Sequence, residues 1–250
     1  MQKQPIKRKY QPKKTIYMKK KPKSITTKYA AKKKREVKTL DITIPDNYPV
    51  NGDYVSDTLS GFVFNLKPQC IQNVVMVTQG AGISQRIGNK IALKSLRIRM
   101  SLEMTDKNST PPQGARFMVV YDRQVNGVYP SVNQVLANIT TGNTTANGNW
   151  LSSINPNYYD RYIVLCDKMF IIGNNANGPV GTWVTTKESF MIDEYIKLKG
   201  LETQFKSTTN GAPIADLSTG ALYIIGFGDQ NENSETYYMS GQLRLRFYDN

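Results

Sequence analysis

Positive charge is concentrated in the first 38 residues, and this restricts where the chain can fold. These residues hold 16 Lys and Arg against one acidic residue, Glu36, whereas residues 39–250 hold 17 basic and 18 acidic residues. A segment of +15 cannot bury enough apolar surface to offset the entropy of ordering it, and self-repulsion keeps it extended. We therefore expect a disordered basic arm over residues 1–38, a transition segment over residues 39–56 and a folded domain over residues 57–250.

The composition of the arm predicts binding to nucleic acid through phosphate. Cationic side chains that neutralise phosphates release counterions, so affinity for a single strand falls steeply as salt rises. The residues concerned are Lys3, Lys7, Arg8, Lys9, Lys13, Lys14, Lys19, Lys20, Lys21, Lys23, Lys28, Lys32, Lys33, Lys34 and Arg35. Tyr10, Tyr17 and Tyr29 either stack on unpaired bases or serve only as spacers. No residue visibly reads a 2′-hydroxyl, so these contacts leave DNA and RNA both open as cargo.

Two clusters within the arm match the basic patches that nuclear import receptors bind. They are Lys20, Lys21 and Lys23, and then Lys32, Lys33, Lys34 and Arg35. A segment this basic also produces such matches by chance, and phosphate binding accounts for the same residues. Membrane insertion is not expected, because the chain has no apolar run of the 18 or more residues that span a bilayer.

The residue types argue against an enzyme, a metal site or a cofactor. The chain has no histidine, which removes the common serine and cysteine catalytic arrangements and the commonest zinc ligand. The glycine-rich residues 80–90 lack the ending of a phosphate loop, and residues 229–240 lack the glycine and glutamate of a calcium loop. Cys70 and Cys166 are expected to be buried thiols rather than a disulfide, although one bridge remains open.

Alternation with a period of two residues predicts β-strands in the remainder. Leu96, Ile98, Met100, Leu102 and Met104 alternate with Arg97, Arg99, Ser101 and Glu103, as in a strand with one apolar and one polar face. Upstream the apolar residues fall on odd positions, so the phase slips by one at Lys94 and Ser95. A β-bulge there would explain the slip.

The same pattern recurs along the body. Further strands are predicted at residues 62–66, 117–121, 161–172, 190–198, 201–206 and 243–247, with one short helix at residues 130–139. Residues 221–227 are predicted as a strand that is apolar on both faces. Segments rich in Gly, Asn, Thr and Pro separate them, and the long one at residues 124–160 is expected to make surface or subunit contacts. Strands without intervening helices favour an all-β fold, an eight-stranded antiparallel jelly roll built as a two-sheet β-sandwich.

Four segments resemble capsid proteins of circular single-stranded DNA viruses of the circovirus and geminivirus type. Residues 85–91 followed by 96–99 are similar to the family's Arg-x-Gly-x-Lys-Ile motif and basic strand. Residues 117–123 resemble its Val-Tyr-Asp strand, and residues 162–168 its Val-Leu-x-Asp-Lys strand. The arm is lysine-rich, however, whereas circovirus arms are dominated by arginine.

The resemblance implies a shell protein rather than an enzyme. It implies a jelly roll that assembles as a homo-oligomer, commonly of 60 copies in a T=1 icosahedral shell, with the arm on a packaged single-stranded DNA genome. The implied partners are that genome, a nuclear import receptor and a host attachment receptor, and the implied locations are the virion and, during assembly, the host nucleus. Arg86, Lys90, Arg97 and Arg99 match the basic motif and are expected to extend the phosphate-binding surface, although Arg97 and Arg99 would equally suit a solvated strand face or subunit ion pairs.

Two other functions remain open at this point. A cellular nucleic-acid-binding protein with a basic tail would explain the arm, but it predicts a basic folded part, and the body carries only −1. A carbohydrate-binding jelly roll would use exposed Trp150 and Trp183. Those tryptophans, with Tyr158 and Tyr159, are also candidates for subunit contacts, or they close the domain's own core.

Overall fold

The computed structural model describes most of the body of the chain and groups it into one compact unit, residues 35–250. The described residues are 36–44, 62–64, 71–104, 113–141, 144–146, 150–172, 189–206, 213–228 and 237–249. The basic arm, Cys70 and Trp183 lie outside them.

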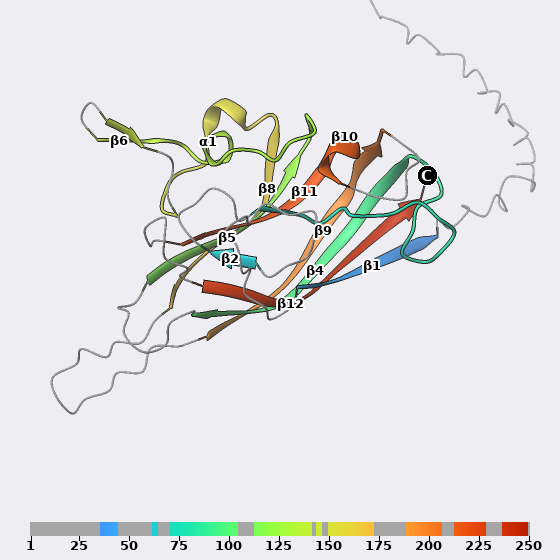
Figure 1. Cartoon of the computed structure of the whole chain (residues 1–250), viewed down its shortest axis with the longest axis horizontal. Coiled ribbons are helices and arrows are strands. Elements are labelled where there is room, and N and C mark those ends of the chain that lie inside the picture. Colours follow the sequence, from blue (N-terminus) through green and yellow to red (C-terminus); the bar gives the residue numbers. More distant parts are fainter. Residues whose placement is uncertain are drawn as a thin grey trace, which may run out of the picture. The chain divides into compact units, whose positions relative to one another are not determined.

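Two antiparallel sheets form the fold (Figure 1). The larger has the order β1 (Val37–Ile44), β12 (Tyr237–Asp249), β4 (Lys90–Met104), β9 (Ser189–Phe205) and β10 (Leu217–Thr219), and β2 (Phe62–Phe64) also pairs with β12. The smaller has the order β3 (Ile71–Asn73), β11 (Ala221–Gly228), β5 (Gln113–Asp122) and β8 (Tyr162–Ile172). Along the chain, the main strands β1, β3, β4, β5, β8, β9, β11 and β12 change sheet at every step except from β5 to β8, which pair within the smaller sheet. This is the order of two interleaved Greek keys, so the predicted jelly roll is confirmed.

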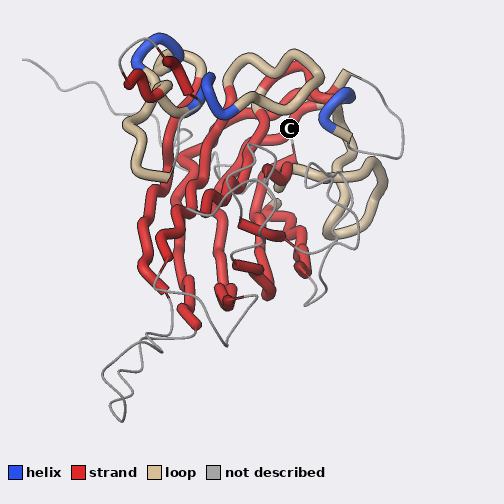
Figure 2. Tube along the Cα trace, turned by 60° about the vertical axis from the view of Figure 1, so that its left-hand side comes forward, coloured by secondary structure: helices blue, strands red, loops and turns tan. Residues whose placement is uncertain are grey.

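Short elements occupy the connections. They are α1 (Val132–Val135), the hairpin of β6 (Ile139–Thr141) and β7 (Thr144–Ala146), and the 3₁₀ turns η2 (Pro156–Tyr158) and η3 (Ile214–Asp216). Figure 2 shows the helical turns and much of the described loop structure gathered near one end of the strands. The short helix predicted within residues 130–139 is therefore present as a single turn.

The predicted bulge is confirmed at Lys94. The pairing of β4 with both neighbours shifts between Leu93 and Ser95, so Lys94 has no direct partner in either ladder. Opposite it, Lys199 and Gly200 adopt positive φ angles of 50° and 81°. This turn of the backbone joins the two strands predicted at residues 190–198 and 201–206 into the single strand β9.

The boundary predicted for the arm is wrong. The arm was expected to end at residue 38 and the jelly roll to begin at residue 57, but β1 starts at Val37 and pairs with β12 along its whole length. Leu40, Ile42 and Ile44 already alternate in the sequence, and Ile42 and Ile44 are buried. The run of charge beside this segment obscured its pattern. Residues 37–44 therefore belong to the fold and not to a transition segment.

The core lies between the two sheets and follows the strand alternation. The larger sheet contributes buried apolar side chains from β4, β9 and β12, and the smaller sheet contributes those of β5 and β11. The hydroxyl of Tyr121 on β5 donates to the backbone oxygen of Glu202 on β9, 2.5 Å away, and so links the two sheets. Burial raises the pKa of Tyr121 to about 12, so this hydroxyl remains a donor at neutral pH.

The outer face of the smaller sheet is covered by the connection between β5 and β8. Val125, Val132, Val135 and Leu136 from this connection are part of the buried core cluster. The Tyr129 ring contacts that of Tyr223 on β11, with centroids 5.8 Å apart. The long segment at residues 124–160, expected to make surface or subunit contacts, thus packs in part on its own domain.

Two arginine–carboxylate pairs hold this connection in place. Arg116 pairs with Asp167 through two bonds of 2.6–2.7 Å and donates to the backbone oxygens of residues 150 and 152. Arg161 pairs with the fully buried Asp122 through two bonds of 2.9 Å. Each buried charge therefore has an opposite charge and satisfied hydrogen bonds, which is the condition under which such pairs are tolerated.

A polar clamp fixes the start of β1. The Lys38 ammonium lies 2.9 Å from a carboxylate oxygen of Asp249 on β12 and 2.9 Å from the backbone oxygen of Gln85. Asp249 also accepts hydrogen bonds from the backbone N–H groups of Ile87, at 2.7 Å, and Gly88, at 3.5 Å. The clamp therefore connects β1, β12 and the loop before β4.

We expect Asp122→Ala to lower the free energy of unfolding by about 3–5 kcal/mol, because it leaves the Arg161 guanidinium without its buried counter-charge. The matched control is Asp41→Ala, which removes an equally bidentate carboxylate from Arg244 at an exposed position. That change should leave stability nearly unchanged. Urea denaturation measures both, and equal losses would show that burial of the first pair is unimportant.

The clamp predicts a specific sensitivity to acid. Burial alone would raise the pKa of Asp249, but Lys38 and the two backbone N–H groups outweigh it and hold the pKa below its usual range. A lowered folded pKa gives stability that is complete above the unfolded pKa of about 3.9 and is lost as pH falls through the folded value.

Asp249→Asn should therefore lower the free energy of unfolding at pH 7 and flatten its fall below about pH 4. Denaturation curves at several pH values measure this. Asp160→Asn, at an exposed loop position, is the control. Parallel pH profiles for wild type and Asp249→Asn would contradict the assignment.

Candidate nucleic-acid interface

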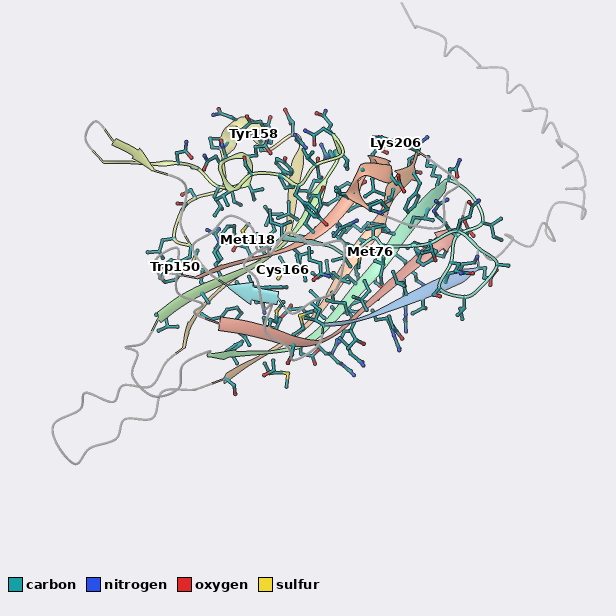
Figure 3. All side chains as sticks on the ribbon, in the orientation of Figure 1. Met76, Met118, Trp150, Tyr158, Cys166 and Lys206 are labelled. Carbon is teal, nitrogen blue, oxygen red and sulfur yellow. The ribbon has the colours of Figure 1, made fainter. Side chains whose placement is uncertain are left out.

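The outer face of the larger sheet carries a patch of cationic side chains, which we call the arginine face. The alternation that turns Leu96, Ile98, Leu243 and Leu245 into the core turns their neighbours outward. The face consists of Asp41, Ser95, Arg97, Arg99, Asp193, Tyr195, Lys197, Gln242, Arg244 and Arg246. Figure 3 shows nitrogen-tipped side chains projecting from this side of β1 and β12.

Strand register sets the spacing within the arginine face. One row crosses the sheet from β1 to β9. It consists of Asp41 on β1, Arg244 on β12, Arg97 on β4 and Tyr195 on β9. Arg246, Ser95 and Lys197 form the row on one side, and Gln242, Arg99 and Asp193 the row on the other. Since neighbouring strands lie about 4.8 Å apart, the four guanidinium groups stand close together on two adjacent strands, β4 and β12.

Two carboxylates partly neutralise the patch. Asp41 accepts two hydrogen bonds from Arg244, at 2.6 and 2.8 Å, and this bonding lowers the pKa of Asp41. Asp193 forms an ion pair with Arg97 and lies 3.8 Å from Nε of Arg99. Five cationic side chains against two carboxylates leave the face at +3, although the body as a whole carries −1.

The face is hollowed at its centre. The hollow has a volume of about 310 Å³ and is lined by guanidinium groups, by Ser95 and Gln242, and by Tyr195, a half-exposed residue. Guanidinium groups bind phosphate oxygens through paired N–H donors, and an exposed aromatic ring accepts a stacked base. The arrangement therefore suits a single-stranded polynucleotide.

Of the four basic residues predicted in the body, the structure brings Arg97 and Arg99 together on this face. Lys90 lies at the start of β4, half exposed, in an ion pair of 2.7 Å with Glu202. Lys90 lies outside the arginine face. That it binds phosphate remains a prediction.

The structure contradicts the prediction made for Arg86. It is fully buried, with its guanidinium 4.0 Å from the centroid of the Phe205 ring. It donates to the backbone oxygen of Gly88, at 2.7 Å, and to the side chain of Asn89, at 3.3 Å. The prediction that Arg86 extends the phosphate-binding surface is therefore wrong for the folded chain. Its role is to hold the loop before β4 against β9.

The predicted phosphate-binding and nuclear-targeting residues of the arm, from Lys3 to Arg35, lie outside the described residues. Their roles remain proposals.

Sequence reasoning missed half of the arginine face. Arg244 and Arg246 fall within the strand predicted at residues 243–247, but the sequence did not place them beside Arg97 and Arg99. That step needs the pairing of β12 with β4, which periodicity does not reveal. Lys197 and Tyr195 carried a readable signal, since both lie outward in the alternation of β9. Asp41 was missed because β1 itself was missed.

Other candidate sites have little support. Among the described residues there is no group of three or more side chains suited to a metal ion, and no helix long and apolar enough to cross a bilayer. Cys166 is a free, half-buried thiol whose pKa is raised by burial, which disfavours the reactive thiolate. Trp150 packs so closely on Gly114 that an added Cβ there would lie 2.1 Å from its ring, so it closes the domain's own core (Figure 3).

Comparisons with solved structures give viral capsid proteins of low similarity. The Israeli acute paralysis virus full particle heated to 63 degrees is 11% identical over 96% of this chain and 83% of that chain, with a TM-score of 0.20. VP1 of Trichodysplasia spinulosa-associated polyomavirus is 8% identical over 86% of this chain and 95% of that chain, with a TM-score of 0.21. The fold assignment depends on the strand order and not on these likenesses.

No curated protein sequence matches this chain. A protein family does: the Geminivirus coat protein/nuclear export factor BR1 family matches residues 2–250. This match includes the segments whose resemblance to capsid proteins was noted above. Because it extends over almost the whole chain, the protein belongs to the Geminivirus coat protein/nuclear export factor BR1 family.

Proposed function

We propose that the protein assembles into a closed icosahedral shell and packages a single-stranded DNA genome, which it binds through the basic arm and the arginine face. The observation that carries the proposal is the asymmetry of the larger sheet. One of its faces is the core, and the other presents four arginines and Lys197 on neighbouring strands. Family membership supports the coat-protein role.

The charge distribution suits a division of labour between arm and body. The arm before β1, residues 1–36, holds 15 basic residues and one acidic residue, a charge of +14, and supplies diffuse neutralisation through lysine, a point charge without a fixed hydrogen-bonding fork. The arginine face supplies forked donors held on a rigid sheet, which position phosphates in defined places. A face of +3 on a body without net positive charge leaves other surface that does not attract nucleic acid and is available for contacts between copies.

The remaining parts of the proposal concern location and partners. As a component of the shell, the protein would be located in the virion. Its role there would be structural rather than enzymatic. The clusters at residues 20–23 and 32–35 would engage a nuclear import receptor, so that assembly occurs in the host nucleus. Sixty copies and a host attachment receptor follow from the capsid resemblance.

The family description also contains nuclear export factors, which makes export of nucleic acid a second candidate function. Such a factor would use the same arginine face and arm. The two functions differ in assembly, because an export factor needs no closed shell.

Light scattering coupled to size-exclusion chromatography of the full-length protein distinguishes these functions. Sixty copies of a 28.2 kDa chain give on the order of 1.7 MDa before any nucleic acid is added. We expect particles of at least this mass with a raised ratio of 260 to 280 nm absorbance. Monomers or dimers that bind single-stranded DNA at low salt without forming particles would overturn the shell proposal and favour export.

The arginine face is tested by the salt dependence of binding. Each phosphate contact on a single strand contributes roughly 0.7 to the slope of log affinity against log salt. We expect the double variant Arg97→Gln and Arg244→Gln to reduce the slope by roughly 1.4, measured by fluorescence anisotropy with a labelled oligothymidylate.

The charge-matched control is Arg123→Gln with Lys206→Gln, two exposed residues outside the arginine face. It should leave the slope close to that of the wild type. Equal reductions in both double variants would mean that net charge alone determines binding.

A further inference from the structure

The carboxylates of the arginine face form ion pairs that core packing does not require. Asp41 and Arg244 each have about half of their side chain exposed, and so does Asp193. Exposed pairs of this kind contribute little to stability because solvent screens them and the side chains lose entropy. A reason other than stability is therefore needed for two carboxylates on the strands that flank the arginines, Asp41 on β1 and Asp193 on β9.

The strand register supplies such a reason. Arg97 and Arg244 are direct neighbours across β4 and β12, and like charges directly opposite one another repel. Each has its own carboxylate, since Asp193 pairs with Arg97 and Asp41 pairs with Arg244. The carboxylates allow the two guanidinium groups to stand side by side above the hollow when no ligand is present.

A carboxylate and a phosphodiester present the same feature to arginine, two oxygens that share a negative charge. Both accept paired hydrogen bonds from a guanidinium group. Asp41, which bonds Arg244 through both of its oxygens, therefore holds this guanidinium in a geometry that also suits a phosphate. The cost of ordering the long arginine side chain is then met in part before the ligand arrives.

Tyr195 completes a site for one nucleotide. It stands opposite Arg97 on β9, at the far end of the row that begins with Asp41, and the residue is 49% exposed. A phosphate on Arg97 and Arg244 would place the attached sugar and base within reach of this ring. Stacking on an aromatic ring accepts any base, which suits a strand bound without regard to sequence.

We propose that Asp41 and Asp193 are exchangeable counter-ions. A backbone phosphate of a single-stranded polynucleotide displaces them from Arg244 and Arg97, and the adjoining base stacks on Tyr195. This inference rests on the proposed function, because it takes the packaged strand as the ligand. In this proposal the two carboxylates compete with the phosphate for the arginines, so removing either carboxylate strengthens the binding of the polynucleotide.

The first experiment measures the affinity of the full-length protein for labelled oligothymidylate and oligouridylate at several salt concentrations. We expect Asp41→Asn and Asp193→Asn each to raise affinity about fivefold at low salt, because each removes a negative charge a few ångströms from the bound phosphate. The effect should be similar for both oligonucleotides and should shrink as salt rises.

The matched control is Glu202→Gln. It makes the same change in charge at an exposed carboxylate of β9 that pairs with Lys90, outside the arginine face. We expect it to raise affinity less than twofold. An equal gain in Glu202→Gln, or unchanged or weaker binding in both aspartate variants, would overturn the exchange.

The second experiment locates the base. An oligonucleotide that contains 5-iododeoxyuridine is photocrosslinked to the full-length protein, and the modified peptide is identified by mass spectrometry. We expect a crosslink at Tyr195 that Tyr195→Leu removes and Tyr159→Leu retains, since Tyr159 is an exposed tyrosine of the connection before β8. Crosslinks confined to other residues would overturn the role of Tyr195.

These results separate the inference from the proposed function. Suppose that particles containing nucleic acid form, but the aspartate variants do not bind more tightly and Tyr195 is not crosslinked. The shell function would then be supported and the counter-ion exchange would be wrong. If the aspartate variants bind more tightly and Tyr195 is crosslinked in a protein that never forms particles, the counter-ion exchange would be supported and the shell function would be wrong.

Discussion

The pairing of β4 with β12 on one side and β9 on the other is the interaction on which the rest of the structure depends. Side chains alternate along a strand, so a slip of one residue in this ladder would move every arginine into the core and every leucine out. The bulge at Lys94 sets the phase on each side of it. One backbone register therefore fixes both the core and the arginine face.

The arginine–carboxylate pairs of the structure are of two kinds, buried and exposed. Asp122 is fully buried and bonded to a guanidinium group, so it has no freedom to exchange partners without loss of stability. Asp41 has the same paired bonding to Arg244, but both side chains are about half exposed, so the guanidinium group is accessible to a competing anion. Burial thus distinguishes ion pairs that hold the fold from ion pairs that are available for binding.

The two faces of the sandwich explain why the candidate site lies where it does. The connection between β5 and β8 covers the outer face of the smaller sheet, with Arg116 bonded to its backbone at residues 150 and 152. No described segment covers the arginine face in the same way. β5 and β11 of the smaller sheet are therefore buried on both sides, whereas Met169 and Ile171 of β8 remain exposed. Among the described residues, the outer face of the larger sheet is left uncovered and is open to a ligand.

Much of the fold was predictable because its signals are local. Period-two alternation identified β4, β5, β8 and β12, a run of apolar residues identified β11, and a phase slip identified the bulge. The sequence did not reveal β1, since its alternating Leu40, Ile42 and Ile44 follow directly on the charged arm, or the continuity of β9 through Gly200.

The site was less predictable because it is not local. Arg97 and Arg244 are far apart in the chain, and only strand pairing makes them neighbours. Arg86 shows the opposite error, since a motif match identified a basic residue but not its burial against Phe205.

A three-dimensional reconstruction of particles loaded with single-stranded nucleic acid would test the central claim most directly. The account predicts that the arginine face lines the interior of the shell, with nucleic-acid density against Arg97, Arg244 and Tyr195. Particles in which this face lies on the outside, or is buried between copies with no nucleic-acid density beside it, would contradict the account.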